Sequence, residues 1–411
     1  MENLIESCEF YDYKPPISEN FNEVGSEFTI TAFNEDLVTR PSKSLLVING
    51  TLSCKESTTT TAGATTVTDL TTIDLEKINF INNGLLYLFD RIDYYIGDAK
   101  IDSIRKPGIT STLKGLVSFE DDITYNNAGW KISPSTGKEN ILTKKCYFCA
   151  TIPMSIVMGF FEDYTQFLYR MPQKLIFYRN TGESSNALCV KQNFSATISL
   201  KDIVWRVPQI KFSLEYETQI RKEILDNTQY EMAYRTWFYQ SIQPPKGATE
   251  FTWDFPVAYS KTKYIILGFQ EGKENNVNVD NSEFQLLDLE NVQVMLNNNV
   301  YYPRERLNLK LSDYRCSSLY YMFNQFKGSY YGKNYEDLKP IVNYSTFLTK
   351  YPIIAIDCSH QPNVIKESLI NVKIMFDWRT ALSATKSTTI HCVMIADRKA
   401  TYNPLNNMVI S

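Results

Sequence analysis

The chain of 411 residues contains one local pattern twice, first over Phe89–Phe119 and again over Leu289–Phe326. In the first copy, alternating residues predict two strands that turn at Gly97-Asp98 and lead into a short helix. The second copy alternates around an Asn-rich turn and continues with helical spacing. Because one chain repeats a hairpin followed by a helix, the sequence predicts two similar domains.

Strand-like alternation fills the rest of both halves, bounded by Pro, Asn, Asp, Ser and Gly. The further predicted strands cover residues 27–33, 44–52, 146–154, 173–179, 194–207, 209–216, 234–243, 248–257, 263–270, 351–358, 370–378 and 388–396. Helices are predicted over 155–168 and 217–227, and the Thr-rich stretch 55–72 is predicted to be a surface loop. Short strands at this spacing favour an all-β fold of two consecutive sandwiches with short inserted helices.

The domain boundaries follow from changes in composition along the chain. Residues 1–26 are polar and contain Pro15-Pro16, which predicts an extended N-terminal arm. The first sandwich is then expected over residues 27–208 and the second over residues 209–411.

Charge and hydropathy exclude several classes of protein. The net charge is −4 and no run of Lys or Arg occurs at either terminus, so strong direct binding to nucleic acid is not expected. No stretch of about 18 apolar residues is present, so no transmembrane segment is expected. Eight scattered Cys and an N-terminus unlike a secretion signal predict a reducing intracellular compartment with unpaired thiols.

The residues that could carry chemistry are few and do not form known constellations. Cys146 and Cys149 make one C-x-x-C pair, but a structural zinc site needs four ligands and the only His are His360 and His391. The acidic stretch 119–122 lacks a calcium-loop frame, as does 161–164, and both are interpreted as solvated helix ends. We therefore predict no catalytic, cofactor-binding or metal-binding residues, no cofactor and no enzymatic activity.

One further segment, Gly328–Asp337, is rich in Tyr and allows two interpretations. Its Tyr residues belong either to the core and turns or to a contact between subunits, where Tyr is enriched.

Several stretches in this order resemble the double jelly-roll major capsid proteins of Polinton/Maverick elements and adintoviruses, which also occur as integrated copies in insect and other animal genomes. The stretches are RIDYYIGDAKIDSIRKPGITSTLKGLVSF (91–119), YNNAGW (125–130), MGFFEDY (158–164), VYYPRERLNLKL (300–311), SYYGK (329–333), IIAIDCSHQ (353–361) and YNPLNN (402–407). None is a catalytic signature, and their order along the chain carries the resemblance.

The resemblance implies two consecutive eight-stranded jelly rolls in one chain. It also implies a homotrimeric, pseudo-hexagonal capsomer that packs against other capsomers in an icosahedral shell around double-stranded DNA. The expected location is the virion, and the expected partners are other copies of the chain, a penton and minor capsid proteins. The missing basic arm fits families in which a separate motor drives the DNA into the shell.

An alternative is a two-domain β-sandwich module or spike that recognises carbohydrate or a protein receptor. Lectin-like sandwiches carry aromatic platforms with acidic or Asn side chains in loops, and this chain contains both residue types. A capsid subunit is expected to form trimers, whereas a binding module is expected to remain monomeric.

Overall fold

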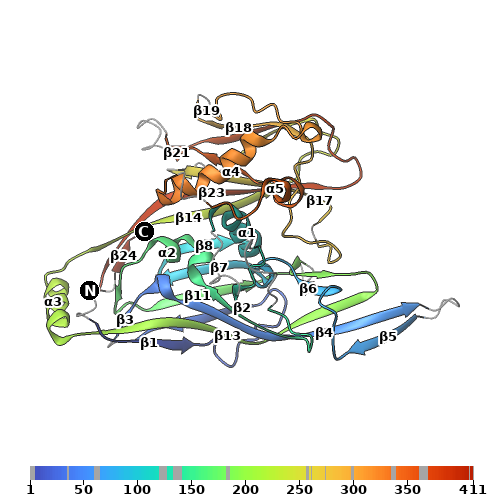
Figure 1. Ribbon diagram of the computed structural model, residues 1–411. Helices are drawn as coiled ribbons and strands as arrows, with labels where there is room; N and C mark the ends of the chain where they lie inside the picture. Colours follow the sequence, from blue (N-terminus) through green and yellow to red (C-terminus); the bar gives the residue numbers. More distant parts are fainter. Residues whose placement is uncertain are drawn as a thin grey trace.

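The computed structural model describes residues 5–34, 37–59, 65–119, 127–132, 141–181, 186–255, 259–260, 262–273, 275–297, 300–334, 339–360, 369–406 and 408–410. Two β-sandwiches lie one above the other, with helices between them and on the upper sandwich (Figure 1). Among the described residues, no helix is long and apolar enough to cross a membrane.

The first sandwich has eight principal strands in two facing sheets. They are β1 (Ile5–Tyr13), β2 (Glu27–Ala32), β4 (Leu45–Thr59), β7 (Phe89–Ile96), β8 (Ala99–Arg105), β9 (Tyr147–Pro153), β11 (Gln173–Arg179) and β13 (Phe194–Phe212). One sheet has the order β1-β13-β4-β9 and the other β2-β11-β7-β8, and every one of these pairs is antiparallel.

The second sandwich repeats this arrangement. Its principal strands are β14 (Tyr230–Ile242), β15 (Glu250–Asp254), β17 (Thr262–Glu271), β18 (Leu289–Leu296), β19 (Val300–Tyr302), β20 (Ile354–Asp357), β22 (Val372–Trp378) and β23 (Thr388–Asn403). Their orders are β14-β23-β17-β20 and β15-β22-β18-β19. Each strand thus holds the place that its counterpart holds in the first sandwich, so both halves have the strand order of an eight-stranded jelly roll.

Short strands and helices complete the chain. The strands are β3 (Val38–Thr39), β5 (Thr65–Leu70), β6 (Ile78–Phe80), β10 (Leu168–Tyr169), β12 (Leu188–Val190), β16 (Tyr259–Ser260), β21 (Leu369–Ile370) and β24 (Met408–Ile410). The helices are α1 (Pro107–Ser118), α2 (Gly159–Asp163), α3 (Leu214–Leu225), α4 (Ser317–Tyr331) and α5 (Tyr344–Lys350). Short 3₁₀ helices are η2 (Pro41–Lys43), η3 (Gly84–Leu88), η5 (Met154–Ile156) and η7 (Leu311–Asp313).

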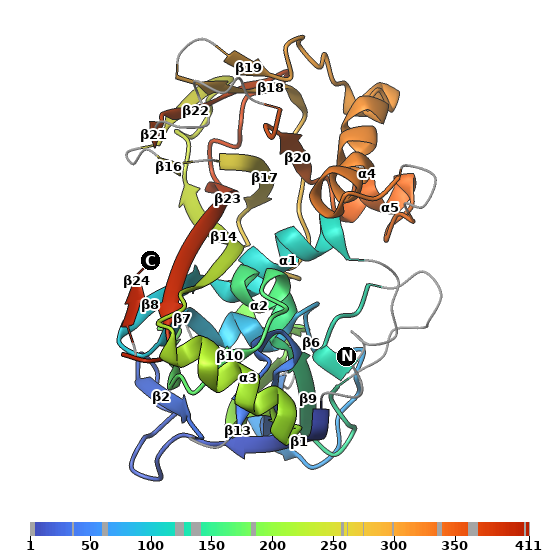
Figure 2. The same ribbon diagram turned by 90° about the vertical axis from the view of Figure 1, so that its left-hand side faces the viewer.

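The repeated hairpin and helix fall at the same place in both sandwiches, which confirms the internal duplication. In the first, β7 turns into β8 and is followed by α1, and in the second, β18 turns into β19 and is followed by α4. Figure 2 shows α1 between the two sandwiches and α4 beside the upper one.

Aromatic side chains fill the space between the sheets of each sandwich. In the first, the Tyr94 ring of β7 meets the Trp205 ring of β13 edge-on at 6.3 Å. In the second, the Phe269 ring of β17 meets the Phe376 ring of β22 edge-on at 5.7 Å. These four side chains are buried, so the apolar phase of the strand alternation points into the core, as the sequence predicts.

The prediction of an extended N-terminal arm is wrong for residues 5–13. This segment is β1, and it pairs with β13 from Ile5 opposite Phe212 to Tyr13 opposite Trp205. It takes the place in the first sandwich that β14 takes in the second. The strand could not be recognised in the sequence because β1 lies at a sheet edge with most side chains exposed. Burial therefore imposes no alternation of apolar and polar residues on it.

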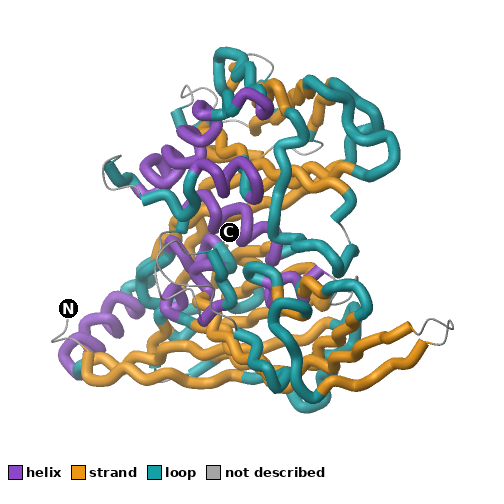
Figure 3. The backbone as a smooth tube through the Cα atoms, turned by 45° about the vertical axis from the view of Figure 1, so that its right-hand side comes forward, coloured by secondary structure: helices purple, strands orange, loops and turns teal. Residues whose placement is uncertain are grey.

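The Thr-rich stretch is also not simply a loop. Strand β4 continues to Thr59 and β5 pairs with it from Cys54 opposite Leu70 to Thr59 opposite Thr65, while residues 60–64 lie outside the described residues. Thr is β-branched and favours extended backbone although it is polar. The resulting hairpin projects from the body of the first sandwich (Figure 3).

The helix predicted over 155–168 is much shorter than expected. Only η5 and the five residues of α2 are helical there, and Tyr164 already has extended backbone. The predicted helix over 217–227 is present as α3, which connects β13 to β14. Strand β13 runs through Pro208 to Phe212, so the predicted division after residue 208 falls inside a strand.

We expect deletion of residues 1–13 to lower the free energy of unfolding by about 3 kcal/mol or more. The deletion removes the backbone partners of one edge of β13, and each such hydrogen bond contributes about 1 kcal/mol. Urea unfolding followed by circular dichroism measures the change. Deletion of residues 408–411 is the control, because β24 has only three residues. Unchanged stability after the first deletion would mean that β1 is a detachable arm.

Candidate functional site: the junction of the two sandwiches

The junction forms where the outer edge of β14 lies against β8 and α2 of the first sandwich. The Tyr234 hydroxyl donates a hydrogen bond to the Ile101 carbonyl oxygen at 2.7 Å. The Thr236 hydroxyl donates to the Asp102 carboxylate at 2.6 Å. All four of these residues are buried, so the first sandwich covers the strand edge that β14 would otherwise expose.

A glycine permits the closest approach between the sandwiches. A Cβ atom placed on Gly159, the first residue of α2, would lie 1.9 Å from the carbonyl oxygen of Arg235 on β14. Any larger residue would push the two backbones apart. Gly159 is therefore required by the contact itself, which explains why a glycine begins such a short helix.

A buried lysine lies at the centre of the junction. Lys114 on α1 has no exposed surface, and its ammonium group is paired with the Glu162 carboxylate of α2. The Tyr330 and Tyr331 hydroxyls of α4 donate to the same carboxylate at 2.6 and 2.7 Å. Two helices of the first sandwich and one helix of the second thus meet at one ion pair.

A second ion pair lies beside it. The Arg235 guanidinium of β14 binds both carboxylate oxygens of Asp163, with Nε 2.8 Å and Nη2 2.5 Å from them. Its Nη1 donates to the Tyr330 carbonyl oxygen at 2.6 Å, and its carbon lies 3.5 Å from the centre of the Tyr330 ring. This fork geometry and the stacked ring restrict how β14 can be oriented.

Burial dominates the electrostatics of the junction. It lowers the pKa of Lys114 from the ordinary value of 10.5, while the Glu162 carboxylate works against this shift. Burial also raises the pKa of Tyr330 well above 10.0 and that of the Asp102 carboxyl above 3.8. The junction therefore shields these groups from water and makes each hydrogen bond there costly to lose.

The interpretation of 161–164 as a solvated helix end is wrong. Glu162 and Asp163 are largely buried and pair with Lys114 and Arg235. One signal in the sequence could have indicated this: Lys114 is the only charged residue in the stretch PGITSTLKGLVS. A lysine inside an otherwise uncharged helix is buried only when a carboxylate reaches it.

The Tyr-rich segment proves to contribute to a contact inside the chain. Tyr330 is buried and both Tyr330 and Tyr331 bind Glu162 across the junction. The end of the segment, residues 335–337, lies outside the described residues. A contact with another subunit through this segment stays a prediction.

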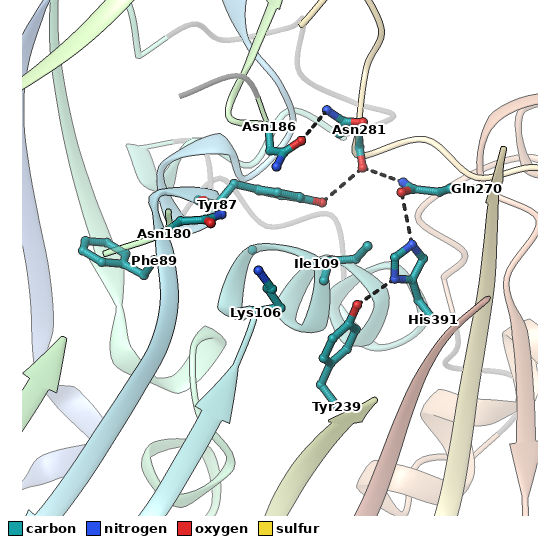
Figure 4. Close-up of a pocket in the computed structure, with 11 residues that line it drawn as sticks. Tyr87, Phe89, Lys106, Ile109, Asn180, Asn186, Tyr239, Gln270, Asn281 and His391 are labelled. Atoms are coloured by element: carbon teal, nitrogen blue, oxygen red, sulfur yellow. Dashed lines mark hydrogen bonds between the residues drawn. The ribbon is translucent and has the colours of Figure 1, made fainter. Parts of the chain in front are cut away.

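A cavity of about 80 Å³, lined by both apolar and polar side chains, lies at another part of the junction (Figure 4). Tyr87, Lys106 and Asn180 line it from the first sandwich, and Tyr239, Gln270, Asn281 and His391 from the second. The Tyr87 hydroxyl donates to the Asn281 carbonyl oxygen at 3.4 Å and so connects the two halves.

His391 is held in one neutral form beside this cavity. The Gln270 amide nitrogen donates to two carbonyl oxygens, of Asn281 at 2.7 Å and Glu283 at 3.1 Å. The Gln270 oxygen must therefore accept from His391 Nε2, which is 3.2 Å away, and Nδ1 accepts from the Tyr239 hydroxyl at 2.8 Å. Burial lowers the pKa of His391 from 6.5 to about 3.

The structure does not assemble the other candidates from the sequence into a site. Cys146 is buried just before β9, whereas Cys149 on that strand is exposed. His360 is exposed and His391 is buried in the second sandwich. Residues 120–122 lie outside the described residues. Within the described part of the chain, no three His, Cys, Asp or Glu side chains gather closely enough to hold a metal ion.

Comparison with known families identifies the class of this fold. The model of the double jelly roll-like domain family matches residues 78–400. The chain therefore belongs to the double jelly roll-like domain family, which agrees with the strand order of both sandwiches. A comparison with curated proteins by sequence finds no match.

Several solved structures from viruses share this fold. The mavirus major capsid protein aligns with a TM-score of 0.58 at 11% identity, covering 98% of this chain and 89% of that one. The Sputnik virophage structure gives 0.58 at 9% identity, covering 99% and 88%. PBCV-1 Vp54, fitted into a Sputnik reconstruction, gives 0.57 at 12% identity, covering 98% and 96%. At identities this low, it is the TM-scores and the coverage that show a shared fold over almost the whole chain.

We expect Lys114→Met to lower the free energy of unfolding by about 3–5 kcal/mol, because it leaves the Glu162 carboxylate buried without its cation. Urea unfolding measures the change. Lys399→Met is the matched control, since Lys399 pairs with Glu231 at the surface and is expected to cost less than about 1 kcal/mol. Equal effects of the two substitutions would contradict the central role of the buried pair.

We expect His391 to make the protein less stable as the pH falls from 6.5 towards 3. The unfolded chain takes up a proton on this residue near pH 6.5, whereas the folded chain does so only near pH 3. The unfolded state therefore binds more protons in this window, and stability falls with pH by about 1.4 kcal/mol per unit.

The test compares the slope of unfolding free energy against pH in the wild type and in His391→Gln. The variant should have a slope smaller by about one proton between pH 4 and 6. His360→Gln, at the exposed histidine, should retain the wild-type slope. An unchanged slope in His391→Gln would show that His391 is accessible to protons in the folded state.

Proposed function

We propose that this chain is a structural major capsid protein and that it has no enzymatic role. The observation that carries the proposal is the duplicated jelly roll, in which two sandwiches of identical strand order are joined in one orientation by a buried junction. The family match over residues 78–400 and the fold shared with the mavirus and Sputnik capsid structures support it.

The proposed assembly is a homotrimeric capsomer with a pseudo-hexagonal outline. Three chains with two similar sandwiches each supply six similar units around one axis, which suits packing of capsomers in an icosahedral shell around double-stranded DNA. A penton and minor capsid proteins are the further proposed partners. The net charge of −4 supports a shell that does not bind nucleic acid strongly by itself.

The proposed location is the virion, after synthesis in a reducing compartment of the host. All eight Cys lie in the described residues and none forms a disulfide there, which is compatible with such synthesis. We also propose membership of the Polinton/Maverick and adintovirus lineage, supported by the stretches of sequence that resemble those capsid proteins.

We propose a division of the chain into two jelly-roll units close to that predicted, 27–208 and 209–411. Residues 5–13 belong with the first unit because β1 pairs with β13. The boundary is best placed in α3, because β13 belongs to one sandwich and β14 to the other. Separate expression of residues 1–213 and 230–411 tests whether each unit folds alone.

We expect the purified chain to sediment as a species of three chains at micromolar concentration, and to form regular shells or flat hexagonal arrays in electron micrographs. Sedimentation velocity and negative staining provide the measurements. A chain that stays monomeric and binds a glycan would favour the carbohydrate-binding or spike-like module. A stable dimer would contradict both proposals.

A further inference from the structure

The equivalent strand edge is covered in the second sandwich and open in the first. In the second sandwich, the edge strand β14 is covered, and Met232, Tyr234, Thr236 and Trp237 are buried. In the first sandwich, β1 holds the same place, but its residues from Glu6 to Asp12 are exposed. Phe10 is 52% exposed there. This difference indicates that the single chain makes one kind of edge contact only once, at β14, and leaves the equivalent edge of β1 open.

β1 is an open edge that carries aromatic side chains. The strand IESCEFYDY contains neither Lys nor Pro, its acidic residues Glu6 and Asp12 are paired with basic residues of β13, and it presents two adjacent aromatic residues, Phe10 and Tyr11, to the surface. Open edges are sites of strand or surface association. Aromatic residues, Tyr above all, are enriched in contacts between subunits.

The equivalence of the two sandwiches also indicates which surface could bind the β1 edge. Within the chain, β14 packs against β8 and α2 of the first sandwich. The strand at the place of β8 in the second sandwich is β19. Beside it lies an open hollow of about 220 Å³ between β19, α4 and β20, lined among others by Tyr302, Pro303, Tyr321, Met322 and Phe326.

The hollow and β1 are complementary in character. The hollow is mainly apolar and aromatic, and Tyr321 at its mouth is 55% exposed. Asp357 also lines the hollow, and exposed Arg304 and Glu305 follow the lining residue Pro303, so its rim carries both signs of charge. The two surfaces therefore offer aromatic rings to one another, and the match between them is apolar.

We propose that the β1 edge of one copy docks against the surface formed by β19 and α4 on the next copy, with Phe10 directed at the hollow. This inference rests on the proposed trimer and names its interface. The contact uses β19 as the junction within the chain uses β8, whereas α4 corresponds in position to α1 and not to α2. Such a contact joins two different surfaces, so it adds copies head to tail, and three copies close a ring of six sandwiches.

The first experiment places a charge on each of the two surfaces in the full-length chain. Phe10→Glu and Tyr321→Glu should each raise the concentration at which trimers dissociate by at least about tenfold, because each puts a carboxylate in an apolar contact. Val67→Glu is the matched control, since Val67 is 57% exposed on the distant β5 hairpin. It should leave the trimer unchanged, and circular dichroism should show all three variants folded.

The second experiment mixes the Phe10→Glu and Tyr321→Glu chains. A head-to-tail contact predicts that the mixture forms dimers of one chain of each kind, because one intact β1 can meet one intact hollow. Neither variant alone should dimerise. A symmetric contact of β1 with β1 would instead let Tyr321→Glu chains dimerise on their own, because their β1 is intact, and would overturn the proposal.

The outcomes separate this inference from the proposed function. A wild-type trimer that survives both Phe10→Glu and Tyr321→Glu refutes this interface while the capsid function stands. A wild-type chain that remains monomeric at every concentration refutes the trimer itself, and the interface with it.

Discussion

The paired charge of Lys114 is the interaction on which the arrangement of the two sandwiches depends. A lysine without exposed surface is stable only if its partners are placed accurately, and here the Glu162 carboxylate is held by hydroxyl groups of α4. A shift of the second sandwich would leave a carboxylate or a hydroxyl without its bond inside the protein. Because such a loss costs several kcal/mol, the ion pair selects one orientation of the halves.

The backbone contact at Gly159 and the Arg235–Asp163 pair also favour this one orientation of the two sandwiches. The glycine permits contact between β14 and α2 without a side chain between them, and the guanidinium binds both oxygens of the carboxylate. These interactions come from β14 and α2, two elements of different sandwiches that the fold brings together at the junction. These contacts therefore hold the two jelly rolls in one relative orientation, and the buried apolar residues of both halves form one cluster.

The sequence predicts the fold where burial imposes a pattern. The hairpin and helix of both halves, with β7 and β18 as their first strands, alternate because one face of each strand lies in a core. The strand β1 and the outer part of β4 are not predicted as strands, because most of their side chains are exposed or half-buried and polar, so apolar alternation carries little signal there. Polar strands of this kind are specified by backbone pairing.

The junction could not be predicted for a different reason. Glu162 lies 48 residues from Lys114 and 168 from Tyr330 along the chain, and nothing local in FEDY distinguishes a solvated carboxylate from a buried one. The isolated lysine of α1 indicates that a partner exists, but not which carboxylate it is. Only the relative placement of the sandwiches identifies it, and that placement depends on the same ion pair.

The fixed orientation at this junction has a consequence for assembly. Contacts between different surfaces close into a ring only if the successive rotations add up to one full turn, and they otherwise continue as an open filament. Within a chain, that angle is fixed by Lys114, Glu162 and Arg235. In the proposed ring, three such fixed steps alternate with three contacts between chains. The buried charges then determine the closure of the ring as well as the stability of one chain.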